Sequence, residues 1–402
     1  MRTRLPATVP LLFGLAAACD DAAPPAHGVV RDSAGIGIVE HEAGERPPEW
    51  SLGETTIALG AIDAGEAYEL YQPLHALRLD DGRVVVANQG TEELRFFGAD
   101  GLHLRTVGRT GGGPGEFRDM WGLVRLPGDS LGVWDWTAKR LTVYDDAGSF
   151  ARVVTAAADV GQFAPRLLGV LDGTFVLLRG FDPMSVFGSG GGLRQDSVRL
   201  LRLAIRDGAL VDSLGPYPGA ERYVRMGEGA FWMRGTKFGR EEHVGVGGGR
   251  IALGDDRKGE IRVYAPDGTL LRIIRLDHAS APVTHEHTAR YDEQHLEEVA
   301  ADRLAEERRR LAELPAADRL PAFRDLFADR LGRLWIEAFD IEAGTPDSWT
   351  ILDPDGRLLG RLRLPPGARP LDAGEDYVLL YDRDVLRLEH VSLHPLRTET
   401  PS

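Results

Sequence analysis

A unit of short strands joined by Asp-Gly turns recurs along most of the chain and constrains its fold more than any other feature. It is clearest from Leu79 to Phe117, where apolar and β-branched runs flank Asp81-Gly82 and Asp100-Gly101 and lead into a glycine-rich segment. Both residues of an Asp-Gly pair tolerate the positive φ of a tight hairpin turn. The sequence therefore predicts successive antiparallel strand pairs.

The unit repeats with a regular offset. Leu94 and Leu141 align 47 residues apart, and the same alignment places Asp135 on Asn88. A later copy places Asp255 at the same position. Degenerate copies give five units and an incomplete sixth, each long enough for four short strands. Repeats of about 40 to 50 residues with four strands each are typical of β-propeller blades.

This plan, together with the segment Gly108 to Phe117, resembles the six-bladed NHL-type β-propellers, which include bacterial lipoproteins. The resemblance implies an all-β fold: a six-bladed β-propeller over 35–396, with the glycine-rich segment as a corner between blades. The incomplete last unit leaves an unpaired sheet edge, which candidate strands at Ile36 to His41 and Thr55 to Leu59 are available to complete. The resemblance to these propellers implies little about activity, because such propellers bind many unlike partners.

One segment lacks the strand pattern. From His285 to Leu314, apolar residues recur at steps of three and four, which predicts a helix that Pro315 ends. Arg303 and Glu307 interrupt the apolar face, so we expect the helix to lie on the domain rather than within it. A second short helix is predicted around 320–326. We therefore expect a mainly helical insertion over 283–327, between the fourth and fifth blades, and a short tail at 397–402.

The N-terminus predicts export. A basic start is followed by an apolar run that is shorter than the about 20 residues of a membrane span and has the build of a secretory signal. Its end, from Leu15 to Cys19, resembles a bacterial lipobox, although Ala16 stands where leucine is usual. The resemblance implies a signal peptide at 1–18, lipidation of Cys19 and a tether over 19–34. A cleaved signal with an incidental cysteine is the alternative. We predict a bacterial envelope protein on the periplasmic side or cell surface, attached to the membrane through a lipid anchor only.

The charge balance excludes one class of partner. Acidic residues outnumber Lys plus Arg by 62 to 47, giving a net charge of −15. Nucleic-acid binding requires a basic footprint, so it is not expected. Cys19 is the only cysteine, which rules out a disulfide within the chain.

Asn88, Asp135 and Asp255 form the most regular polar set. If these repeat positions end strands near the axis, their oxygens would converge on the central channel and could hold calcium. Propeller lactonases and gluconolactonase-like enzymes use such a metal to activate water or polarise a carbonyl. The alternative is that Asp and Asn accept backbone hydrogen bonds in turns. Repetition favours this alternative, because a catalytic site needs different residues from different blades.

Other candidate metal or nucleotide sites are weaker. Four histidines, His278, His285, His287 and His295, are close in sequence and would supply zinc ligands, but surface positions explain them equally well. The glycine runs lack the strand-to-helix context of a nucleotide-binding loop. The sequence contains no Gly-x-Ser-x-Gly motif of an α/β-hydrolase.

The segment from Tyr223 to Arg240 is basic and aromatic within an acidic chain, and we predict it to be a ligand-facing loop. Aromatic and arginine side chains are enriched at binding surfaces. Its candidate ligand-binding residues are Tyr223, Arg225, Trp232, Arg234, Lys237 and Arg240. Further aromatic residues at Trp121, Trp134, Trp136 and Trp335 would line a rim or pack between blades.

These observations predict a non-catalytic, envelope-anchored propeller that binds an envelope protein, peptide or glycan through rim loops and the channel mouth. The alternative is a metal-dependent hydrolase or lyase of the lactonase kind that uses the central channel, with calcium as its cofactor. A third hypothesis is a sensor or assembly component whose helical insertion docks a partner. No catalytic residue and, outside the calcium hypothesis, no cofactor is predicted.

Overall fold

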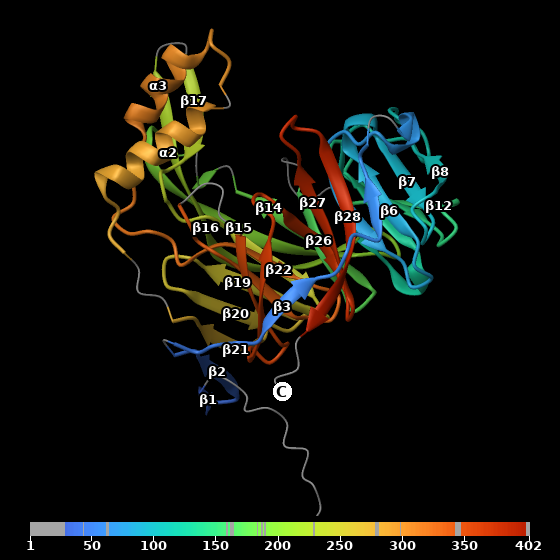
Figure 1. The fold of residues 1–402 in the computed structure, drawn as a ribbon, viewed down its shortest axis with the longest axis horizontal. Helices are drawn as coiled ribbons and strands as arrows, with labels where there is room; N and C mark the ends of the chain where they lie inside the picture. The colour runs from blue at the N-terminus through green and yellow to red at the C-terminus, as the bar shows by residue number, and fades with distance from the viewer. Residues whose placement is uncertain are drawn as a thin grey trace, which may run out of the picture.

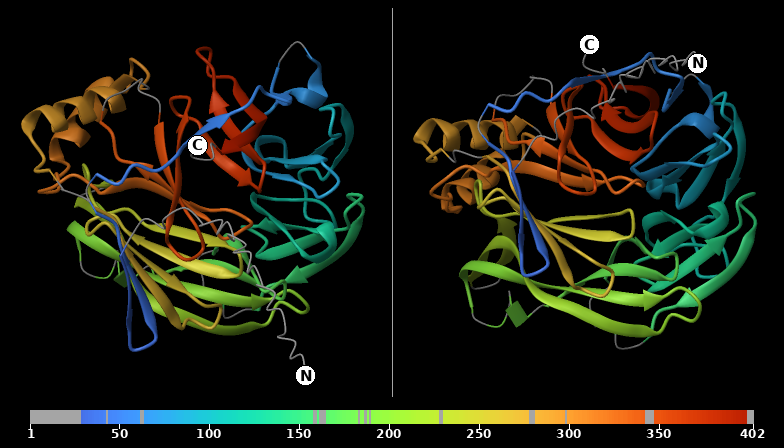
Figure 2. Two further views of the ribbon diagram at one scale, coloured as in Figure 1. Left: turned by 60° about the horizontal axis from the view of Figure 1, so that its bottom comes forward. Right: turned by 90° about the horizontal axis from the view of Figure 1, so that it is seen from below.

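The computed structural model describes residues 29–398, apart from 43, 62–63, 158–159, 161–164, 183, 186–187, 189, 228–229, 278–280, 298 and 342–346. The signal segment, Cys19, most of the tether and the end of the tail lie outside the described residues. The described chain forms curled, mainly antiparallel sheets arranged around a common centre (Figures 1 and 2).

The first two sheets follow the repeat that the sequence shows. One consists of β5 (Pro73–Arg78), β6 (Val84–Asn88), β7 (Glu93–Phe97) and β8 (His103–Val107). The next consists of β9 (Met120–Arg125), β10 (Leu131–Asp135), β11 (Arg140–Tyr144) and β12 (Phe150–Thr155). In each sheet the strands pair in chain order, from the centre outward.

The next two sheets are larger. The third contains β13 (Arg166–Leu171), β14 (Phe175–Phe181), β15 (Gly192–Ala204), β16 (Leu210–Gly227) and β17 (Ala230–Gly235). The fourth contains β18 (His243–Gly247), β19 (Arg250–Asp255), β20 (Glu260–Tyr264) and β21 (Leu270–Arg275). A hairpin of β1 (Val29–Ser33) and β2 (Ile36–Glu40) extends this fourth sheet, because β2 pairs in parallel with β21.

The C-terminal strands form two groups that the N-terminal segment joins. One group is β22 (Phe323–Ala328), β23 (Leu334–Ala338), β24 (Asp347–Leu352) and β25 (Leu358–Leu364). The other is β26 (Arg369–Ala373), β27 (Tyr377–Arg383) and β28 (Glu389–Thr398). β3 (Glu49–Leu52) pairs with both β25 and β28, and β4 (Ile57–Leu59) pairs antiparallel with β28.

The expected closure by N-terminal strands is therefore confirmed for the predicted strand at Thr55 to Leu59. The predicted strand at Ile36 to His41 also forms, but it extends the fourth sheet instead of the last one.

The core lies between neighbouring sheets, where the repeated apolar positions meet. The aligned residues Leu94 and Leu141 are fully buried. Phe117, at the end of the glycine-rich segment, packs with Leu94, Phe96 and Tyr144 in one cluster. Burial of these side chains supplies the main favourable term for holding adjacent sheets together.

The glycine-rich segment is a corner between two sheets, as the sequence predicts. It connects the outermost strand β8 to the innermost strand β9. Arg140 of β11 donates hydrogen bonds to the carbonyl oxygens of Gly112, Gly113 and Glu116, at 3.0, 3.1 and 2.5 Å. The corner is thus held by a side chain of the following sheet, and its glycines serve the scaffold.

Two helices lie between β21 and β22 in the chain, beside β17 (Figure 1). α2 spans His285–Glu297 and α3 spans Leu304–Glu313, so the single helix predicted for this segment is two helices. α3 ends before Pro315, as expected. No helix in the described part of the chain combines the length and apolar character that crossing a bilayer requires.

The second helix, predicted around 320–326, is wrong, because Phe323–Ala328 is strand β22. Phe323 and Leu326 are both buried although they are three residues apart. The register of β22 shifts between Phe323 and Asp325, which marks a β-bulge. A bulge adds one residue between two side chains on the same face, so a strand takes on the spacing of a helix. The predicted helical region at 283–327 accordingly includes part of this strand.

Candidate functional site: a central cavity

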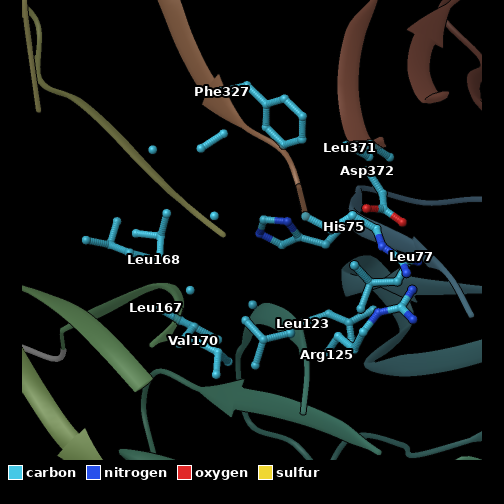
Figure 3. A pocket seen from close by; sticks show the side chains of 18 of the residues that line it. His75, Leu77, Leu123, Arg125, Leu167, Leu168, Val170, Phe327, Leu371 and Asp372 are labelled. Carbon is cyan, nitrogen blue, oxygen red and sulfur yellow. The ribbon is translucent and has the colours of Figure 1, made fainter. Parts of the chain in front are cut away.

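A cavity of about 720 Å³ lies at the centre of the ring of sheets (Figure 3). Its wall comes from the first strands of successive groups: β5, β9, β13, β18, β22 and β26. β26 packs against β5, β5 against β9, β9 against β13, β13 against β18, and β18 against β22. The volume lies within the range of small-molecule binding pockets, about 300 to 1,000 Å³.

Glycines allow these first strands to approach one another. A Cβ added at Gly122 of β9 would lie 2.8 Å from Leu167 of β13. One added at Gly169 of β13 would lie 2.7 Å from Val246 of β18. Both distances are shorter than carbon–carbon contact allows, so the close packing around the cavity depends on a missing side chain in each strand.

Most of the cavity wall is apolar. The labelled apolar side chains in Figure 3 are Leu77, Leu123, Leu167, Leu168, Val170, Phe327 and Leu371. Such a wall favours the apolar part of a ligand, since covering apolar surface on both sides removes it from water.

His75 projects into the cavity from β5 (Figure 3). Among the described residues, no donor or acceptor lies within hydrogen-bonding distance of its ring nitrogens. Burial in the channel, and then the charges of Arg369 and Arg166, lower the pKa of His75 to about 4. The side chain is only partly exposed, so burial disfavours the charged form of the ring. The imidazole is neutral near pH 7 and offers one donor and one acceptor.

Arg166 and Arg369 also line the cavity, and each is the first residue of its strand, β13 and β26. Among the described residues, neither forms an ion pair with a carboxylate. The guanidinium carbon of Arg369 lies 4.7 Å from the centre of the Tyr381 ring. Both side chains are exposed to solvent.

The arginines on the other side of the cavity differ, because they have carboxylate partners. Arg125 and Arg330 both contact Asp80, at 3.0 and 3.1 Å. Asp372 is buried and accepts hydrogen bonds from the Arg78 backbone N–H and the Tyr377 hydroxyl, each at 2.9 Å. Burial raises the pKa of Asp372. These groups are engaged in holding the wall together.

An aromatic pair flanks the cavity. Trp121 of β9 lines it and makes an edge-on contact with Trp136, with ring centres 5.3 Å apart. Trp136 is 37% exposed, whereas Trp134 and Trp335 are fully buried in the core. Of these four tryptophans, Trp121 is the one that lines the cavity as the described residues define it.

The repeated polar set ends the second strand of its sheets, one strand away from the cavity wall. Asn88 accepts a hydrogen bond from the Tyr71 backbone N–H at 2.6 Å and donates to Thr91 at 2.9 Å. Asp135 accepts backbone hydrogen bonds from two N–H groups, at 3.0 and 2.8 Å. Asp255 accepts two from the turn after β19 and pairs with Arg240 at 2.7 Å.

None of these three side chains lines the cavity as the described residues define it. Within that part of the chain, no group of three His, Cys, Asp or Glu side chains is placed to hold a metal ion. Their contacts resemble the hydrogen-bonding alternative, because each side chain accepts at least one backbone N–H group of a connecting segment. Sequence alignment identified a shared position correctly, but that position belongs to the second strand and not to the first.

The basic and aromatic segment is a hairpin and not the predicted loop. Tyr223 and Arg225 lie on β16, and Trp232 and Arg234 lie on β17. The rings of Tyr223 and Trp232 pack with their centres 5.6 Å apart. In the sequence, glycines separate two short runs that contain aromatic and apolar residues, Tyr223 to Met226 and Ala230 to Met233, which is the signal that could have identified the hairpin.

The cations of this hairpin face the two helices. Three ion pairs join the two parts: Arg225 with Glu313, Arg234 with Glu307, and Lys237 with Asp292. The last pair is 2.6 Å long, and the Lys237 side chain is only 7% exposed. The segment that the sequence marks as a binding loop is therefore the surface on which the helices pack. Glu307, which interrupts the apolar face of the helix, is one of the contacts.

The histidines near α2 have separate surroundings. His287 accepts a hydrogen bond from the Thr284 backbone N–H at the start of the helix. His295 stacks on Tyr291, with ring centres 3.9 Å apart. His278 lies outside the described residues.

Comparison with known proteins shows the fold class. No family model and no curated protein matches the chain. A member of the DUF4221 family from Bacteroides vulgatus is similar in structure, with a TM-score of 0.52 and 10% identity over 88% of this chain and 100% of that one. A virginiamycin B lyase from Staphylococcus aureus has a TM-score of 0.41 and 11% identity over 86% and 99%. A gluconolactonase from Xanthomonas campestris has a TM-score of 0.39 and 13% identity over 88% and 98%.

At these identities the similarity concerns the fold alone, and only the first likeness is close enough to carry an argument. Together with the curled sheets around a common centre, it identifies the fold as a β-propeller. His75, Arg166 and Arg369 were not selected from the sequence. Their common signal is a polar residue in the first strand of a unit, which becomes visible only when the first strands of all units are aligned.

Proposed function

We propose that the protein is a non-catalytic, envelope-anchored propeller of six blades that binds a peptide, glycan or protein segment at the mouth of its central channel. The observation that carries this proposal is the cavity of about 720 Å³ with an apolar wall and a neutral His75, which has no hydrogen-bond partner within the described part of the chain. Ligand-binding sites usually combine such an apolar wall with a few polar groups.

The proposed blade count follows the first strands. β5, β9, β13, β18, β22 and β26 would each begin one blade of an NHL-type propeller. β4 would then be the fourth strand of the last blade, and the two helices would be an insertion between the fourth and fifth blades.

The cavity is a better candidate than the basic hairpin at β16–β17. The cations at Arg225, Arg234 and Lys237 already have carboxylate partners, so a ligand would have to displace the helices to reach them. The metal-dependent hydrolase or lyase remains an alternative. It would require ligand oxygens other than those of Asn88, Asp135 and Asp255, which already accept backbone hydrogen bonds.

The anchor is a separate part of the proposal and has its own test. Cys19→Ala should move the protein from the membrane fraction to the soluble fraction, because the lipid would be the only membrane attachment. Full retention in the membrane fraction would refute lipidation as the anchor.

Binding at the cavity can be tested with a panel of tripeptides and oligosaccharides in a thermal-shift assay. A compound at 100 times its Kd should add about 2.7 kcal/mol of stability. Leu168→Trp, which places a bulky side chain in the cavity, should remove the shift. Leu104→Trp on β8 is the matched control, because Leu104 is exposed on an outer strand and away from the cavity. The proposal fails if no compound stabilises the protein or if Leu168→Trp leaves the shift unchanged.

A further inference from the structure

We propose that the cavity binds an organic carboxylate, with Arg166 and Arg369 holding the anionic group and the leucine-rich wall holding an apolar body. This inference rests on the proposed binding role of the cavity and names the chemical class of its ligand.

The first argument is the contrast between the cavity and the rest of the molecule. The chain carries a net charge of −15, and two of the four arginines that line the cavity, Arg125 and Arg330, pair with Asp80. Arg166 and Arg369 form no ion pair among the described residues although both line the same cavity. A planar guanidinium group matches a carboxylate with two parallel hydrogen bonds, so two such groups at one cavity favour an anion.

The second argument is the position of the competing acids. Asp172 follows the last residue of β13, whereas Arg166 is the first. At about 3.3 Å per residue, these two positions lie about 20 Å apart along the strand. Asp372 already accepts hydrogen bonds from the Tyr377 hydroxyl and the Arg78 N–H. Asp325 acts on Arg369 electrostatically without forming an ion pair among the described residues, and it lies 3.8 Å from His243, which it helps to keep protonated.

The third argument is His75, which lies within the electrostatic reach of both arginines. After burial, their charges are the next causes that lower its pKa, so both guanidinium groups lie near enough to act on the ring. A neutral imidazole can donate one hydrogen bond to a bound carboxylate without adding charge to the cavity. It would therefore orient the ligand, while the arginines supply the attraction.

The apolar wall of the cavity determines which kind of group the ligand carries beside its carboxylate. Leu168, Leu371 and Phe327 face the same cavity as His75 (Figure 3). The volume is sufficient for a compound of about dipeptide to tripeptide size. Two sources share this chemistry: the free carboxyl terminus of an apolar peptide, and a small organic acid with an apolar body.

The test compares matched acid and neutral probes by calorimetry, with the full-length protein in lipid nanodiscs and empty nanodiscs as the blank. One pair is N-acetyl-Leu-Phe with a free carboxylate or a terminal amide, and the other is 4-phenylbutyrate with 4-phenylbutanol. We expect at least one acid to bind tenfold or more tightly than its neutral partner. Binding of the peptide acid alone would identify a peptide terminus, and binding of both acids would identify organic acids more generally.

Substitutions test whether Arg166 and Arg369 cause the preference for the acid probe. Arg369→Gln and Arg166→Gln should each reduce the preference for the acid by fivefold or more and leave the binding of the neutral probe unchanged. Arg206→Gln is the matched control, because Arg206 is exposed in a turn and its side chain pairs with the neighbouring Asp207. A second measurement avoids substitutions: added salt should weaken binding of the acid more than binding of the neutral probe.

Equal affinity for the two members of each pair, with binding abolished by Leu168→Trp, would overturn the carboxylate inference and leave the proposed function standing. Absence of binding by all four probes would also overturn it. The panel of tripeptides and oligosaccharides then decides separately whether the cavity binds a ligand.

Discussion

The stability of the fold should depend on the protonation of His243, the first residue of β18. Its side chain is 4% exposed, with Nε2 3.4 Å from Asp256 and Nδ1 3.8 Å from Asp325. Burial by itself would lower the pKa of His243, but the two carboxylates outweigh burial and raise the pKa to about 9. Glu241 and Glu337 are the other acids that sense this charge.

The sign and size of the effect follow from this pKa. The unfolded chain has a histidine pKa of about 6.5, so the extra stability is fully present below pH 6.5 and is lost as the pH rises through 9. The difference corresponds to about 3 kcal/mol at most. Burial raises the pKa of Glu337 to about 7, so its contribution is present below pH 4.5 and is lost by about pH 7. The range from pH 7.5 to 9.5 therefore reports mainly on His243.

Urea unfolding at several pH values measures this contribution. The free energy of unfolding of the unmodified protein should fall by about 2 kcal/mol between pH 7.5 and 9.5. His243→Gln should be less stable at pH 7 and should lose most of this slope. His287→Gln on α2 is the control and should keep it. The reasoning is refuted if the unmodified protein is equally stable across this range, or if His243→Gln retains the full slope.

Three further predictions concern the scaffold. Lys237→Met should expose the chain around 299–303 to limited proteolysis, because it leaves Asp292 of α2 without its cation; unchanged cleavage would show that the ion pair does not hold the helices. Arg140→Met should lower the free energy of unfolding by about 3 kcal/mol, since it removes three hydrogen bonds to the corner at 108–117; a loss below about 1 kcal/mol in urea would contradict this. Leu59→Ala should cost about 2 to 4 kcal/mol, because this buried residue of β4 closes the ring. An unchanged melting temperature would rule out that role.

The sequence was sufficient for the propeller class and for much of its local structure. Leu94 and Leu141 are core residues, the segment 108–117 is a corner, and β4 closes the last sheet. These features could be predicted because each follows from spacing or turn chemistry within a few residues. Asn88 and Asp135 were correctly aligned, but alignment does not say how far a repeat position lies from the axis.

The parts that could not be predicted depend on contacts between distant segments. The cations of the β16–β17 hairpin looked available for a ligand because their partners, Glu307, Glu313 and Asp292, lie about 55 to 90 residues further along. His75 gave no signal because a single histidine in a strand is uninformative until the fold places it beside Arg166 and Arg369. The bulge in β22 gives its buried residues the three-residue spacing of a helix, and the helix predicted around 320–326 was therefore wrong.

The pairing of β3 and β4 with β28 has a consequence for the order in which the protein can be made. Residues 49–59 leave the ribosome early, but their partner strand, Glu389–Thr398, is among the last segments to be synthesised. Translation must therefore be nearly complete before the ring can close. A nascent chain therefore stays open during nearly all of its synthesis, and a truncation before Glu389 would leave β3 and β4 without the strand with which both pair.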